Sequence, residues 1–164
     1  MRRRALTVLG LIALLAVPPT GALALDGDDW KSFLPPNALL PFQVREIRAA
    51  TYPHHDPGQA ETAGYAPASA CVPGRGVPYV KSIAEGQDDL AVAEPNVLVY
   101  APLTGGGEEL VAVGYASKTP ASLFGREFDP PSDAVPYHTL RAWVWKVNPA
   151  GLLNATNPRV SCDG

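Results

Sequence analysis

The sequence predicts one α+β domain in which short N-terminal helices pack on a small antiparallel sheet with long loops and one disulfide. Helix signals are confined to residues 38–63, and the strongest β-forming runs follow residue 96. The 18 prolines and 15 glycines favour many turns over long helices. The two cysteines, Cys71 and Cys162, allow a single bridge.

Residues 1–24 have the pattern of a cleavable secretory signal peptide. Arginines at positions 2–4 precede an uncharged apolar run over residues 5–17, and the small-residue motif Ala-Leu-Ala ends at residue 24. The apolar run is shorter than the roughly 20 residues that cross a bilayer, although an uncleaved N-terminal anchor is the alternative. We therefore expect a secreted, extracellular protein with no membrane attachment after cleavage.

The predicted mature chain is acidic. Loss of three arginines leaves ten Lys and Arg against sixteen Asp and Glu, a net charge of −6. This sign disfavours binding to nucleic acid and to anionic lipid. Residues 25–37 are expected to form a mobile lead-in, and residues 38–164 a single globular domain.

Two helices are predicted near the start of the domain. Residues 38–50 carry an apolar stripe at helical spacing, but Pro41 is tolerated only in a first turn, so this helix is expected to start near there. The second helix covers residues 57–63, with Asp56 as its N-cap and Gly64 as a left-handed stop.

Four strands are expected downstream, two of which form a hairpin. Residues 68–72 can form a short strand, and residues 96–103 and 110–115 are predicted to pair across a glycine-rich turn. Residues 138–147 are predicted to form one strand with apolar residues on both faces, which indicates a central, covered position.

The aromatic residues of these strands have two interpretations. Trp143 and Trp145 would share one face of the last strand, with Tyr100 and Tyr115 on neighbouring strands. Such a row can bind carbohydrate or peptide, but large aromatic side chains also dominate cores.

A disulfide between Cys71 and Cys162 is predicted from the even count and the oxidising compartment. It would close a loop of 92 residues, for a stabilisation of up to about 4–5 kcal/mol in the chain-entropy model. Metal-binding thiols are the competing interpretation, but the spacing matches no zinc motif.

Histidines and one carboxylate suggest a possible metal site. His55, Asp56 and His138, with His54 beside them, can ligate zinc or copper if the fold brings them together. The alternative interpretation makes Asp56 a helix cap and the histidines loop residues.

No catalytic signature is present in the sequence. There is no G-x-S-x-G motif, and the acid pairs Asp88–Asp89 and Glu108–Glu109 lie in expected turns. The segment Gly74-Arg75-Gly76 lacks the ending of a phosphate loop. No catalytic residue is therefore assigned, and no cofactor other than a possible metal ion is expected.

Two segments together resemble a family of small, uncharacterised, exported bacterial proteins. One contains Cys-Val-Pro-Gly at residues 71–74, and the other runs from Trp-Val-Trp at residues 143–145 through Asn-Pro-Ala-Gly to Asn-Pro-Arg-Val-Ser-Cys at residues 157–162. The resemblance covers about residues 45–162 and implies an architecture without an activity. Members of that family often carry histidines that would suit a metal site. Of those positions, His55 matches, but this chain has Pro78, Arg141 and Val147 at the others, which weakens the metal hypothesis.

The sequence therefore favours a secreted, non-enzymatic domain that binds an unknown ligand or protein, with the aromatic face as a candidate surface. The alternative is a metal-binding protein or metal-dependent hydrolase that uses His54, His55, Asp56 and His138.

Overall fold

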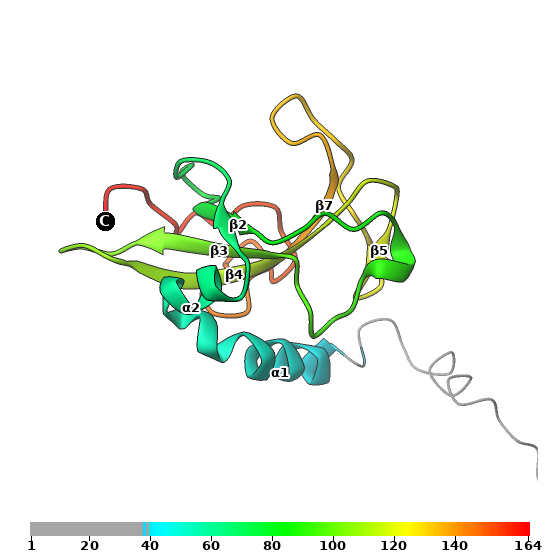
Figure 1. Cartoon of the computed structure of the whole chain (residues 1–164), viewed down its shortest axis with the longest axis horizontal. Coiled ribbons are helices and arrows are strands. Elements are labelled where there is room, and N and C mark those ends of the chain that lie inside the picture. Colours follow the sequence, from blue (N-terminus) through cyan, green and yellow to red (C-terminus); the bar gives the residue numbers. More distant parts are fainter. Residues whose placement is uncertain (1–37, 39) are drawn as a thin grey trace, which may run out of the picture. The chain divides into compact units, whose positions relative to one another are not determined.

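The computed structural model describes residue 38 and residues 40–164. The predicted signal peptide and lead-in lie outside the described residues. The described part begins with α1 (Leu40–Thr51), which continues into η2 (Tyr52–His55), and α2 (Pro57–Thr62) follows (Figure 1). α1 begins one residue before Pro41, as the sequence predicts, and it buries Ile47.

α2 is specified by the residues that flank it. The Asp56 carboxylate accepts a hydrogen bond from the Gly58 amide at 2.9 Å. Pro57 occupies the first turn, where the N–H that proline lacks would have no partner within the helix. Gly64 follows the helix with a φ of +94°, a conformation that glycine adopts without strain. The predicted cap and stop are confirmed.

The sheet is antiparallel and five-stranded, so the α+β prediction is confirmed. Its strand order is β1-β2-β3-β4-β7, and a separate pair is formed by β5 and β6. The strands are β1 (Ala66–Pro67), β2 (Val77–Val80), β3 (Val97–Pro102), β4 (Glu108–Ser117), β5 (Ser122–Leu123), β6 (Arg126–Glu127) and β7 (His138–Ala142), with a 3-10 turn, η3 (Gln87–Asp89), before β3.

The hairpin of β3 and β4 confirms the strongest strand prediction, whereas the predicted strand over residues 68–72 is wrong. The chain leaves β1 before Ala68, and Val72 and Gly76 form an isolated antiparallel bridge across a turn. The strands on either side of this segment are β1 and β2. Gly76 is essential to this turn, because a Cβ there would lie 2.3 Å from the Tyr100 carbonyl oxygen. Pro67 places a residue without an N–H in β1, at one edge of the sheet.

The two faces of the sheet pack against different parts of the chain. One face carries Leu98 and Tyr100 of β3 and is covered by α1 and α2, which bury Ile47 and Ala60 against it. We call this the helical face. The other face carries Val99 of β3 and is covered by the chain after β7, including Trp143 and Val160. We call this the C-terminal face.

The prediction of one central strand over residues 138–147 is wrong. β7 ends at Ala142 and lies at the edge of the sheet. The chain then makes a tight turn in which the Val144 amide donates to the Ala142 carbonyl at 2.9 Å. This turn breaks the strand alternation, so Trp143 packs in the core of the C-terminal face and Trp145 packs against the core of the helical face.

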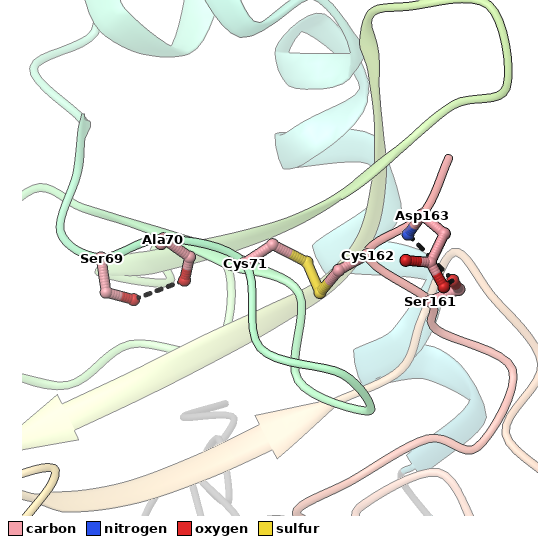
Figure 2. The surroundings of a disulfide bond; sticks show 6 residues. All are labelled: Ser69, Ala70, Cys71, Ser161, Cys162 and Asp163. Atoms are coloured by element: carbon pink, nitrogen blue, oxygen red, sulfur yellow. Dashed lines mark hydrogen bonds between the residues drawn. A yellow bond between two sulfur atoms is a disulfide. The ribbon is translucent and has the colours of Figure 1, made fainter.

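The predicted disulfide is confirmed. Cys71 and Cys162 are bonded, with Cα atoms 5.8 Å apart (Figure 2). Backbone hydrogen bonds reinforce the junction, since the Gly74 amide donates to the Val160 carbonyl at 2.8 Å and the Asn157 amide to the Gly74 carbonyl at 2.9 Å. The bridge therefore fixes the C-terminal segment to the turn before β2.

Candidate functional site

A cavity of about 440 Å³ opens between the helical segment and the connection from β2 to β3. Its volume lies in the range of small-molecule sites. Four stretches of chain line it: the end of α1 and η2, the turn after α2, the chain that follows β2, and the residues just before β3. The lining residues are Ala50, Thr51, His54, Ala63, Tyr65, Lys81, Ser82, Ile83, Ala84, Glu85, Asp89, Ala93, Glu94, Pro95 and Asn96.

Buried tyrosines hold the walls of this cavity in place. The Tyr100 hydroxyl donates to the His54 carbonyl at 2.5 Å and so fixes η2 to the sheet. Tyr65 donates to the Pro95 carbonyl at 2.5 Å, and Tyr115 donates to the Val92 carbonyl at 2.6 Å. Burial raises the pKa of all three phenols, which therefore stay protonated donors at neutral pH.

The His54 side chain is the most unusual group in the cavity wall. Its Nδ1 atom is buried and has no hydrogen-bond partner within the described residues. The ring meets Tyr65 edge to face, with centroids 5.4 Å apart. Burial, and to a lesser extent the charge of Lys81, lower the pKa of His54. A neutral imidazole therefore faces the cavity with unused hydrogen-bonding capacity.

Several polar groups of the lining are already engaged. The Asn96 side chain bonds the Ala116 backbone twice, donating to its carbonyl and accepting from its amide, both at 2.8 Å. Asp89 accepts from the Glu85 amide at 3.1 Å, and Glu85 pairs with Lys118 at 2.6 Å. These groups shape the wall.

Three other groups at the mouth are not engaged. Among residues 38 and 40–164, the side chains of Lys81, Ser82 and Glu94 make no hydrogen bond or ion pair. The Lys81 ammonium lies 5.7 Å from the centre of the Tyr65 ring. Together with His54, they form a set of polar groups available to a ligand.

The residues of the predicted metal site make different contacts in the structure. His55 packs on Trp145 with ring centroids 4.2 Å apart, and Asp56 caps α2. His138 begins β7 and pairs with Ser117, the last residue of β4. In the part of the chain that the structure describes, no three His, Cys, Asp or Glu side chains gather as a metal site would need.

The predicted aromatic row is not a surface. Tyr100 and Tyr115 are buried in the helical-face core, and the Trp143 indole donates to the Asn154 carbonyl at 2.7 Å on the opposite side of the sheet. Trp145 is partly buried, and its indole donates to the Thr51 hydroxyl at 3.1 Å. The tertiary contacts of Trp143 and Trp145 assign both rings chiefly to packing.

The two acid pairs lie in different elements of the fold. Asp88 and Asp89 lie in η3. Glu108 accepts from the Tyr79 hydroxyl at 2.9 Å, and Glu109 forms an ion pair with Lys146. Glu108 and Glu109 are the first residues of β4, so the expected turn there is wrong, and both have structural partners.

The cavity is absent from the sequence-based predictions. His54 was singled out there only as a neighbour of His55 in a metal site. Lys81 and Glu94 belong to no motif. Their segments are brought together by the pairing of β2 with β3, which the bond from the Lys81 amide to the Asn96 carbonyl at 3.0 Å extends. No local pattern in the sequence signals such a site.

No family model, curated protein or solved structure matches the chain. The resemblance to small exported bacterial proteins stays a prediction. No helix within the described residues is long and apolar enough to cross a membrane.

Proposed function

We propose that the chain is an exported, non-enzymatic domain that binds a small polar molecule in the cavity beside His54. The observation that carries this proposal is the His54 ring, which lines a cavity of about 440 Å³ and whose buried Nδ1 atom has no partner among the described residues. A buried polar atom without a partner is costly. Since neither nitrogen of the His54 ring has a hydrogen-bond partner among the described residues, the ring has its full bonding capacity left for a ligand.

Export is proposed from two observations of different kinds. Residues 1–24 have the charge, apolar run and small-residue motif of a signal peptide. The bond between Cys71 and Cys162 is of a kind that persists mainly in oxidising compartments.

A binding role fits the cavity better than a catalytic one. Two hydroxyl groups of the cavity lining already have structural partners. Thr51 donates to the Ile47 carbonyl at 2.7 Å, and Tyr65 donates to the Pro95 carbonyl. Nucleophilic catalysis needs a hydroxyl or thiol hydrogen-bonded to a base. His54 makes no such bond to Ser82, the remaining hydroxyl of the lining.

The test is an NMR titration of the exported protein with three small probes: isobutylamine, isobutyrate and isobutyramide. We expect at least one of them to shift the His54 ring signals and the amides of Ala84 and Ala93, and to leave the His138 ring unchanged. His54→Phe should abolish the response, whereas His138→Phe should retain it. No shift with any probe into the millimolar range would overturn the proposal.

A further inference from the structure

We infer that the ligand of the His54 cavity is a small zwitterion, a free α-amino acid with an aliphatic side chain. This inference rests on the proposed function and names the ligand class of the same site. It follows from the charges that the fold leaves unused at the mouth of the cavity.

The charged groups of the lining divide into engaged and unengaged sets. Glu85 is paired with Lys118, and Asp89 is hydrogen-bonded to the backbone. Lys81 and Glu94 remain, one ammonium and one carboxylate, both exposed at the mouth. The mouth therefore offers one group of each sign, and a ligand that carries both charges can use both.

Lys81 and Glu94 are held near each other but are not paired. The Lys81 amide donates to the Asn96 carbonyl at 3.0 Å, and Glu94 lies two residues before Asn96. Their side chains nevertheless form no ion pair, and the Lys81 ammonium lies over the ring of Tyr65 instead. A ligand carrying a carboxylate and an ammonium can bind both, the carboxylate at Lys81 and the ammonium at Glu94.

The remaining wall fits an aliphatic side chain. Part of the remaining lining is small and apolar, and its apolar residues are Ala50, Ala63, Ile83, Ala84, Ala93 and Pro95. A cavity of about 440 Å³ holds a molecule of amino-acid size. The neutral imidazole of His54 can bond the ligand without repelling either of its charges.

The experiment compares L-leucine with two molecules that each lack one of its charges. Isocaproate is leucine without the ammonium, and isoamylamine is leucine without the carboxylate. In NMR titrations of the exported protein, we expect leucine to bind at least about threefold more tightly than either, because each exposed charge pair adds a modest increment.

Variants assign each preference to one residue. Lys81→Met should remove the preference for leucine over isoamylamine, and Glu94→Gln should remove the preference over isocaproate. The matched controls Lys146→Met and Glu127→Gln, which lie outside the cavity, should keep both preferences.

The outcomes separate the two proposals. Equal binding of all three molecules, or tighter binding of a singly charged one, overturns the zwitterion inference and leaves a small-molecule site in place. The zwitterion inference is also overturned if Lys81→Met and Glu94→Gln both keep the preference for leucine over the two singly charged molecules. If neither these molecules nor the isobutyl probes shift the cavity signals, the proposed function fails as well.

Discussion

The two faces of the sheet are closed by different kinds of interaction. On the helical face, tyrosine hydroxyls bond the backbone of the covering segments, and a cavity remains between those segments. On the C-terminal face, Trp143 and Val160 fill the core, and the bond between Cys71 and Cys162 fixes the cover covalently. The comparison indicates that the C-terminal face provides rigidity, whereas the helical face leaves the cavity in which we propose that a ligand binds.

The largest expected effect on stability comes from removing the disulfide. The double variant Cys71→Ala/Cys162→Ala should lose about 4–5 kcal/mol of unfolding free energy in the chain-entropy model, because the disulfide joins residues 91 positions apart. Urea denaturation measures this loss. Ser69→Ala, an exposed change near the bridge (Figure 2), should have little effect. A double variant as stable as the native chain would contradict the role given to the C-terminal face.

The two tryptophans should differ in their contributions to stability. Trp143 is 3 % exposed, so Trp143→Ala should cost about 3–5 kcal/mol. Trp145 is only partly buried, and Trp145→Ala should cost about 2 kcal/mol. Thermal and urea unfolding of both variants measure the difference. Equal losses of unfolding free energy would contradict the difference in burial between the two rings.

A smaller effect is expected from one hydroxyl of the helical face. Tyr100→Phe removes the bond to the His54 carbonyl and should cost about 1–2 kcal/mol. It should also speed hydrogen exchange of amides in η2, because this bond fixes η2 to the sheet. Tyr52→Phe is a matched control, since the Tyr52 side chain is 70 % exposed. Unchanged exchange in η2 would show that the hydroxyl does not anchor it.

The smallest effect concerns the charge state of His54. Its pKa is lowered in the folded chain, so below the ordinary value of 6.5 the unfolded chain binds the proton more readily. The free energy of unfolding should therefore fall as pH drops below 6.5. His54→Gln should reduce this dependence, and His138→Gln serves as the control. An NMR titration midpoint for His54 at or above 6.5 would refute the environment assigned to its ring.

Local signals in the sequence predicted those parts of the fold that depend on neighbouring residues. Asp56, Pro57 and Gly64 act within a few positions of one another, and they define α2 as expected. The hairpin of β3 and β4 likewise follows from two β-forming runs around a glycine-rich turn. The disulfide needed only two cysteines and an oxidising compartment.

The failures have tertiary causes. Trp143 and Trp145 alternate as in a strand, but the amide of Trp143 bonds the Leu152 carbonyl and those of Trp145 and Lys146 bond the Val111 carbonyl. The Val111 carbonyl is free to accept these bonds because the register between β3 and β4 shifts beside it, which leaves Val111 without a partner residue in β3. No local pattern in the sequence signals these long-range bonds, so a strand was predicted where the chain turns.

The candidate site was largely beyond sequence-based prediction for a related reason. What distinguishes His54, Lys81 and Glu94 is the lack of a bonding partner within the described residues. That property depends on where every neighbouring side chain lies. A sequence contains the residue types, whereas availability for a ligand arises only after folding.

The proline in β1 has a consequence for how copies of this chain meet. An unpaired strand edge is a template on which another chain can extend the sheet. At this edge Pro67 has no N–H to donate, and β1 is only two residues long. At the opposite edge, the backbone of Thr139 in β7 is already bonded twice to Asp129, at 2.7 and 3.0 Å. Both margins of the sheet therefore discourage edge-to-edge pairing with the sheet of another copy.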